Sequence, residues 1–245
     1  MAGAIDFTTN CIGGSNKSCG VTLLHGLPEC CIHHSYEPEL DELITGRAGA
    51  VRFKGSNLDL CPIIAYYQVE DGHVKTQNII DRISHWILEL LTSLPMRCAP
   101  IITTDLNGKV GCKEPNTMPE TEGMNGDNLK LPSSPQGEYI SEILGTAEQD
   151  MVWANTFHPG GTFASYYQDS ARSRIDFIGA PRGLQQGMTR CLTLREKGCD
   201  LQLCKNTPLN RDHVPDYAAW EYYLRFNDNK ESRNLLESIL TLTLA

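Results

Sequence analysis

The chain has 245 residues, of which 40% are hydrophobic and 21% charged, and its formal net charge is −9. This length suffices for one large domain with a substantial core, and the composition is typical of globular rather than disordered proteins. No apolar run approaches the roughly 20 residues that span a bilayer. Residues 1–6 lack the basic region and apolar core of a signal peptide, so we expect an intracellular protein of the nucleus or cytoplasm with no membrane contact.

The negative charge argues against broad nonspecific binding of nucleic acid, although bound divalent cations could neutralise a site built from carboxylates. Ten cysteines are scattered through the chain. Without an export signal we expect them to be reduced and partly buried. Cys30 and Cys31, followed by His33 and His34, fit no standard zinc spacing, and we assign no zinc site there.

Residues 1–18 are polar and glycine-rich without periodicity, and they predict a poorly structured N-terminal segment. The run that ends at Lys17 and Ser18 departs from a phosphate-binding loop, because no glycine directly precedes Lys17. Short apolar runs bounded by polar or turn residues then predict strands over residues 19–24, 30–35, 48–53 and 58–67.

Residues 76–94 predict the clearest helix, because large apolar side chains recur at helical spacing until Pro95. The helix leads into an apolar run that ends at Asp105, so strand, helix and strand form one layered unit. Residues 112–136 are rich in Pro, Gly, Asn and acids and predict a long surface loop. Residues 134–137 open a second helix, whose apolar face carries Ile140, Ile143 and Leu144.

Three strand-like segments follow, and the last of them carries Asp176 among apolar residues; they lie at 151–157, 162–167 and 173–178. A buried carboxylate needs a cationic or hydrogen-bonding partner, which we expect for Asp176. Six basic residues stand against three acidic ones between positions 169 and 197. This surplus could face phosphates, or it could be an ordinary solvated surface.

Three positions carry polar groups suited to chemistry. Asp105 and Asn107 end a buried strand before Gly108, and residues i and i+2 of a strand project from one face. An acid beside an amide can take a proton from water, but the same pattern is also a common turn signal. Tyr66 could be an ordinary aromatic at a strand end, and His213 an ordinary surface histidine.

Taken together, the chain resembles the endonuclease/exonuclease/phosphatase superfamily, the magnesium-dependent phosphodiesterases of the apurinic-endonuclease type. The matching fragments follow the family's order at residues 20–24, 104–107, 173–177 and 211–215. Residues 105–111 are most similar to endonuclease domains of non-LTR retroelements. Smaller matches are Gly46 with Arg47, Tyr66, and Thr162 with Phe163.

The resemblance implies the fold and the domain limits. It implies an α/β fold, a four-layer α/β/β/α sandwich of two mixed sheets packed face to face, over residues 19–216. Residues 217–245 are helix-prone and predict a helical tail. In the family, two earlier strands carry an Asn and a Glu. Because no segment of residues 1–18 reads as such a strand with its Glu, we expect a domain truncated at its N-terminus.

The resemblance also implies roles for individual residues. Asp105 would orient or deprotonate the attacking water, and Asn107 would fix that geometry. His213 would contact the scissile phosphate while Asp176 holds its ring. Tyr66 would donate a hydrogen bond to the phosphate.

The cofactor and substrate follow from the same resemblance. Asp212 would be a ligand of Mg²⁺, for which Mn²⁺ could substitute, because hard cations prefer carboxylate oxygen. The substrate would be nucleic acid, DNA rather than RNA, or a phosphorylated small molecule. A catalytically inactive remnant that keeps a scaffold or binding role is the alternative to a hydrolase.

Overall fold

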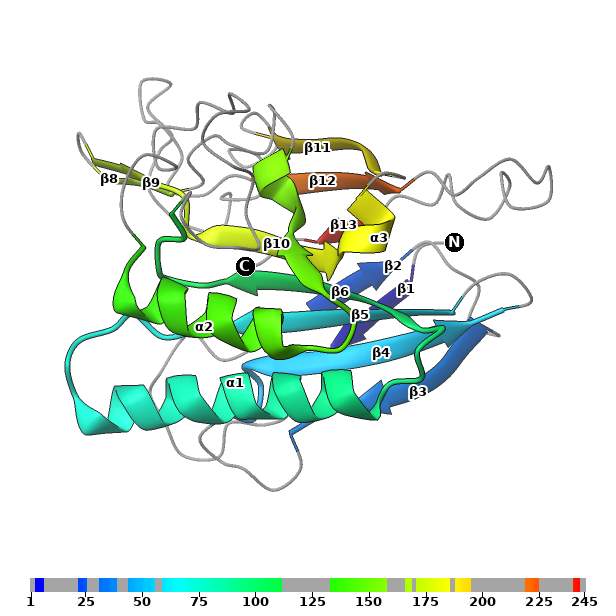
Figure 1. Cartoon of the computed structure of the whole chain (residues 1–245), viewed down its shortest axis with the longest axis horizontal. Helices are drawn as coiled ribbons and strands as arrows, with labels where there is room; N and C mark the ends of the chain where they lie inside the picture. The colour runs from blue at the N-terminus through cyan, green and yellow to red at the C-terminus, as the bar shows by residue number, and fades with distance from the viewer. Residues whose placement is uncertain are drawn as a thin grey trace.

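A computed structural model describes residues 3–6, 22–25, 31–38, 44–55, 59–111, 133–157, 166–168, 171–185, 188–194, 219–224 and 240–242. Its largest sheet has six strands (Figure 1). In order across the sheet these are β3 (Ile32–Tyr36), β4 (Ala48–Lys54), β5 (Asp59–Tyr66), β6 (Ala99–Asp105), β10 (Asp176–Pro181) and β7 (Met151–Trp153).

The sheet is mixed, because β5 and β6 are parallel while the other neighbouring strands are antiparallel. Helix α1 (Val74–Ser93) connects the two parallel strands. This confirms the layered strand–helix–strand unit that the apolar periodicity predicts. The buried face of α1 includes Ile80, Ile83 and Leu91, and each such side chain stabilises the fold by about 1.5–3 kcal/mol.

The second helix, α2 (Pro135–Thr146), begins where the sequence predicts. Ser134 caps it, since the Ser134 Oγ accepts a hydrogen bond from the Gly137 N–H at 3.2 Å. The Trp153 Nε1 donates to the Ser141 Oγ at 2.9 Å and so joins α2 to β7. Both helices lie along one side of the six-stranded sheet (Figure 1), and their side chains share its main apolar core.

Smaller sheets complete the described fold. They pair β1 (Gly3–Asp6) with β2 (Thr22–His25), β8 (Tyr166–Gln168) with β9 (Ala171–Ser173), and β11 (Met188–Leu194) with β12 (Ala219–Leu224) and β13 (Leu240–Leu242). Strand β13 contacts β2. Figure 1 shows β11 and β12 on the side of the six-stranded sheet away from α1.

Two predictions at the chain ends need correction. The helix expected within residues 217–245 is wrong where β12 and β13 form, because aromatic side chains of β12 favour a strand and β11 supplies its partner. Strand β1 lies inside residues 1–18, for which we expected no regular structure, and it forms by pairing with β2. The division of the chain at 18/19 and 216/217 stays a prediction.

The strand expected over residues 151–157 is also only half right. Strand β7 ends at Trp153, and a 3₁₀ turn, η3 (Ala154–Phe157), follows it. The Thr156 hydroxyl donates to the Trp153 carbonyl at 2.6 Å, and the Asn155 side chain bonds the backbone of β10. These side-chain bonds compete with strand pairing.

The last of the three segments expected to be strands, residues 173–178, is divided between β9 and β10. A short helix, α3 (Arg182–Gln185), follows β10. Within the described ranges, no helix has the length and apolarity needed to cross a membrane.

Candidate active site at the ends of β5, β6 and β10

Tyr66, Asp105 and Asp176 form one row across three strands, at the edge where β6 ends (left in Figure 1). Asp105 is the register partner of Tyr66 in the parallel pair and of Asp176 in the antiparallel pair. Register partners project from the same face of a sheet. Tyr67 and Phe177 project from the other face into the core beneath the helices. The row therefore lies on the face turned away from α1 and α2.

The two carboxylates are almost fully buried, with Asp105 5% and Asp176 6% exposed. Burial and the charge of Asp176 raise the pKa of Asp105 to about 8, although hydrogen bonds from Asn107 act in the opposite direction. Two facing carboxylates repel each other unless a proton or a cation lies between them. The raised pKa favours the protonated form of Asp105, and a cation bound between the carboxylates would displace that proton.

Asn107 reaches Asp105 by a different geometry from the one expected. The strand ends at Asp105, and Asn107 has φ 48°, in the left-handed region, so the two side chains do not project along one strand. Instead the Asn107 N–H donates to the Asp105 Oδ1 at 3.2 Å, and its Nδ2 donates to the Tyr67 carbonyl at 2.8 Å. The turn interpretation is confirmed, and the turn itself brings the amide to the carboxylate.

The N-terminus of α2 holds the loop that follows Asp105. The Lys109 N–H donates to the Ser134 Oγ at 3.0 Å, and the Gln136 Nε2 donates to the Leu106 carbonyl at 2.7 Å. A Cβ at Gly137 would clash with the Lys109 carbonyl oxygen, so only glycine allows this approach. The helix thus fixes residues 106–111, and with them the position of Asn107.

Asn155 positions β10, and sequence reasoning assigned it no role. Its side chain is fully buried; the Nδ2 donates to the Asp176 carbonyl at 3.3 Å and the Oδ1 accepts from the Ile178 N–H at 3.1 Å. Arg174 is also fully buried, with its guanidinium carbon 5.1 Å from the centroid of the Phe177 ring. An amide within an apolar run was the available signal for Asn155.

Two predicted site residues, Asp212 and His213, lie outside the described residues. The contact between Asp176 and His213 and the metal-ligand role of Asp212 stay predictions. In the part of the chain that the structure describes, no group of three or more His, Cys, Asp or Glu could hold a metal ion. Cys61 and Cys98 are buried free thiols.

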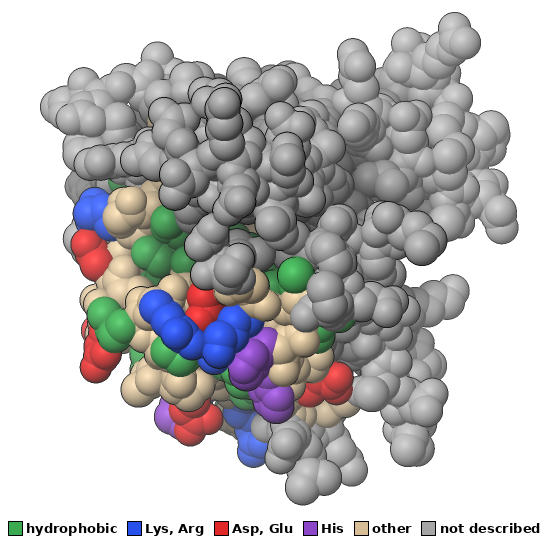
Figure 2. Space-filling view, turned by 90° about the vertical axis from the view of Figure 1, so that its right-hand side faces the viewer, with side chains coloured by type: hydrophobic (Ala, Val, Ile, Leu, Met, Phe, Trp, Pro, Cys, Tyr) green, Lys and Arg blue, Asp and Glu red, His purple; other side chains and the backbone are tan. Residues whose placement is uncertain are grey.

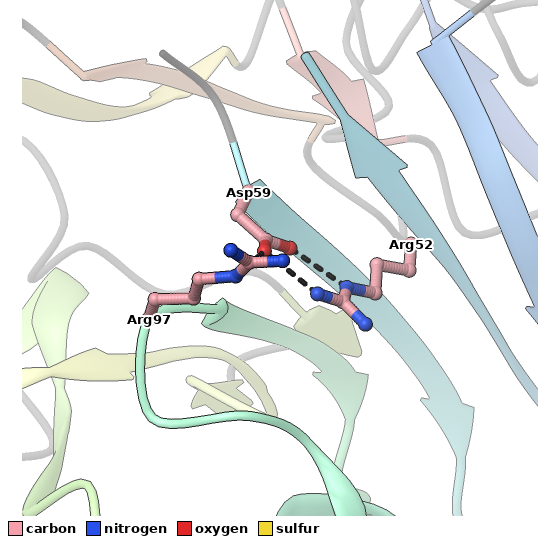
Figure 3. A network of polar contacts seen from close by, with 3 residues as sticks. All are labelled: Arg52, Asp59 and Arg97. Carbon is pink, nitrogen blue, oxygen red and sulfur yellow. Dashed lines mark hydrogen bonds and ion pairs between the residues drawn. The ribbon is translucent and has the colours of Figure 1, made fainter. Parts of the chain in front are cut away.

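A network of opposite charges lies at the other end of β5 and β6 (Figure 3). Asp59 accepts two hydrogen bonds of 2.7 Å from the Arg52 guanidinium, and the Arg97 Nε lies 3.0 Å from the same carboxylate. The bonds from Arg52 lower the pKa of Asp59 to about 2. On this side of the molecule, basic side chains surround an acidic one, with histidines beside them (Figure 2). Because Asp59 satisfies these arginines, the network is structural.

The fold can be compared with known proteins. No family model matches the sequence, and no curated protein matches it. Solved structures do match. A 3′ phosphatase, NExo from Neisseria bound to a product DNA hairpin, has a TM-score of 0.58 and 11% identity, covering 92% of this chain and 80% of that one.

Two further structures give the same result. An AP endonuclease from Archaeoglobus fulgidus has a TM-score of 0.55 and 13% identity over 92% of this chain and 80% of that one. The endonuclease domain of TRAS1, a telomere-specific non-LTR retrotransposon, has a TM-score of 0.56 and 10% identity over 93% and 81%. Identities this low establish the fold rather than the chemistry. Over about 92% of its length, this chain shares the fold of these solved structures.

Proposed function

We propose that this chain hydrolyses phosphodiesters of nucleic acid with the help of Mg²⁺, acting as an endonuclease. The observation that carries the proposal is the buried pair of Asp105 and Asp176, aligned with Tyr66 on one face of a sheet in this fold. Burial and the charge of Asp176 raise the pKa of Asp105, and such an environment favours a site that receives a cation.

The donor atoms suit a hard divalent cation. Asp105 and Asp176 offer carboxylate oxygens, which Mg²⁺ and Mn²⁺ prefer to nitrogen or sulfur. In this proposal Asp212 supplies a further carboxylate. A cation bound there would supply positive charge to the phosphate as its negative charge develops. With few protein ligands it would retain several waters and bind weakly.

Each side chain of the row then has a defined task. Asp105, once ionised, takes a proton from water as the water oxygen bonds to phosphorus and the bond to the leaving oxygen breaks. Tyr66 donates a hydrogen bond to a phosphate oxygen, and Asn107 holds the Asp105 carboxylate in place.

His213 completes the proposed machinery. In its cationic form it contacts the scissile phosphate, while Asp176 orients its ring and raises its pKa. The leaving oxygen takes its proton from solvent.

The substrate class follows from charge and from the structural neighbours. One neighbour is bound to a DNA hairpin, and another comes from a telomere-specific retrotransposon. We infer DNA rather than RNA as the substrate. Since this chain carries a net charge of −9, binding to a polyanion depends on cations at the site and on local basic residues.

A hydrolysis panel tests the proposal. Labelled single- and double-stranded DNA, RNA and phosphorylated small molecules are incubated with the full chain, with Mg²⁺ or with a chelator. We expect Mg²⁺-dependent cleavage of DNA that falls about 100-fold or more in Asp105→Asn. Asp150→Asn, at an exposed carboxylate paired with Arg182, is the matched control and should cleave normally.

The other outcomes of the panel separate the alternatives. Turnover of a phosphorylated small molecule alone would replace the endonuclease with a phosphatase. A folded chain that cleaves nothing would be the inactive remnant with a scaffold or binding role. Equal loss of activity in Asp105→Asn and Asp150→Asn would contradict the assignment of Asp105.

A further inference from the structure

Arg47 is held by its backbone at the end of the row. Gly46 has φ 76°, which favours glycine, and it turns the chain into β4. The Arg47 N–H donates to the Ile44 carbonyl at 2.9 Å, and the Arg47 carbonyl accepts from the Tyr66 N–H at 2.8 Å. This hydrogen bond extends the antiparallel pairing of β4 and β5 by one residue beyond Ala48 and Ala65. Arg47 therefore lies opposite Tyr66.

The Arg47 side chain is buried but incompletely satisfied. It is 8% exposed, and its guanidinium carbon lies 5.5 Å from the centroid of the Tyr66 ring. Its Nη1 has no hydrogen-bond partner, and no described carboxylate forms an ion pair with it. Arg52, on the same strand and 7% exposed, instead makes two hydrogen bonds to Asp59.

This contrast indicates that packing alone does not explain Arg47. Burying an unpaired cation costs stability, and stacking on an aromatic ring offsets only part of that cost. A buried cation with an unsatisfied donor is expected where a bound ligand supplies the hydrogen-bond acceptor. A guanidinium with an open donor is suited to the oxygens of a phosphate.

The position of Arg47 decides which phosphate it would meet. Neighbouring strands lie about 4.8 Å apart, so the backbone of Arg47 is about 10 Å from that of Asp105, with Tyr66 between them. The cation therefore lies beside the reacting position rather than at it.

We propose that Arg47 is a positioning residue that binds the substrate phosphate next to the one that reacts, on the β4 side of Tyr66. This inference rests on the proposed function and deepens it, because only a substrate with consecutive phosphates can use both positions. Arg47 thus gives the site a preference for oligonucleotides over substrates with a single phosphodiester.

The test compares Arg47→Met with Arg97→Met, which removes the same charge at the opposite end of β6, where Arg97 is 64% exposed. Binding of a labelled DNA oligonucleotide is measured by anisotropy at several salt concentrations, in an Asp105→Asn background that prevents turnover. We expect Arg47→Met to weaken binding about 10-fold and to reduce the slope of log K against log salt by about 0.7–0.9, one phosphate contact. Arg97→Met should leave both unchanged.

Two further readouts separate a positioning role from a structural one. The melting temperature of Arg47→Met should stay the same or rise, because an unpaired buried cation is removed. With active protein, KM for the oligonucleotide should rise in Arg47→Met while hydrolysis of bis(4-nitrophenyl) phosphate, which has one phosphodiester, is unchanged. Arg47→Lys, which keeps the charge, should recover most of the salt slope.

Several outcomes would overturn the inference. A lower melting temperature with an unchanged salt slope would make Arg47 structural. Equal effects of Arg47→Met and Arg97→Met on binding would mean that Arg47 contributes only through the net charge of the chain. A wild-type chain that binds no oligonucleotide would also overturn it. If the wild-type chain hydrolyses nothing but Arg47→Met still reduces the salt dependence of binding, the phosphate contact is supported and the proposed hydrolytic function is not.

Discussion

At the scale of single residues, Asp105 and Asp59 show how the surroundings shift the pKa of two buried acids of one sheet in opposite directions. The pKa of Asp105 is raised to about 8, so between about pH 4 and 8 the native state keeps a proton that the unfolded chain releases. Asp105 therefore lowers stability progressively as the pH rises through this window. The pKa of Asp59 is lowered to about 2, so its contribution to stability is present above about pH 4 and is lost as the pH falls towards 2.

The first prediction concerns Asp105→Asn in metal-free solution. The amide has nearly the same shape and carries no charge, so repulsion from Asp176 disappears. We expect the free energy of unfolding at pH 8 to rise by more than about 1 kcal/mol, with no gain at pH 4. Urea denaturation at both values measures this. A gain that is the same at pH 4 and pH 8 would contradict the shifted pKa.

The second prediction concerns Asp59→Asn, for which the sign is reversed. Loss of the carboxylate leaves Arg52 buried without its partner, and we expect a loss of about 2–3 kcal/mol at pH 7 that shrinks towards pH 2. Asp150→Asn breaks an exposed ion pair to Arg182 and should cost less than about 1 kcal/mol. Equal losses in both variants would show that burial does not strengthen the Asp59 network.

At the scale of elements, the contact between α2 and the loop after β6 decides where Asn107 lies. Gly137→Ala places a methyl group against the Lys109 carbonyl, so the loop or the helix must shift. We expect lower stability and, if the chain hydrolyses DNA, lower activity. Gly145→Ala lies on the same helix with open space around it and should raise stability by about 0.5–1 kcal/mol without changing activity.

Thermal melting and hydrolysis rates of the two alanine variants check this third prediction. The comparison is matched because both changes add one methyl group to α2. If Gly137→Ala were as stable and as active as Gly145→Ala, the helix would not hold the loop. Loss of stability with full activity would mean that the position of Asn107 does not depend on α2.

The sequence predicts some of the helices and strands better than others, for physical reasons. Helix α1 and its flanking strands follow from local periodicity, which tertiary contacts then reinforce. Strands β12 and β13 depend on partners distant in the chain, so a helix-prone composition misled the prediction. For the site, family resemblance selected Tyr66, Asp105 and Asp176. That they lie in one row follows from the register of the strands, which the sequence alone does not give.

Roles that depend on nonlocal contacts left only a weak local pattern. Asn155 looks like any polar residue in an apolar run, although it bonds the backbone of β10. Arg47 matched a family motif, but only the contrast with Arg52 shows that no carboxylate among the described residues pairs with its charge. The geometry of Asn107 was mistaken because a strand was extended two residues too far.

At the scale of the whole molecule, an acidic chain with a self-repelling carboxylate pair should respond to divalent cations. With few ligands the site holds Mg²⁺ weakly, so we expect the melting temperature to rise only at millimolar-scale concentrations. Asp212→Ala should abolish that rise, and in metal-free solution it could raise stability by relieving repulsion. Calorimetry with and without Mg²⁺ measures both effects. An unchanged Mg²⁺ response in Asp212→Ala would remove Asp212 from the ligand set.

The central claim is that Asp105 and Asp176 form a cation site whose metal-free form holds a proton. The most direct test is the number of protons released when Mg²⁺ is titrated into the weakly buffered chain at pH 7. Since the pKa of Asp105 is about 8, we predict release of close to one proton per bound cation, and none from Asp105→Asn. Mg²⁺ binding without proton release, or equal release from wild type and Asp105→Asn, would contradict the account.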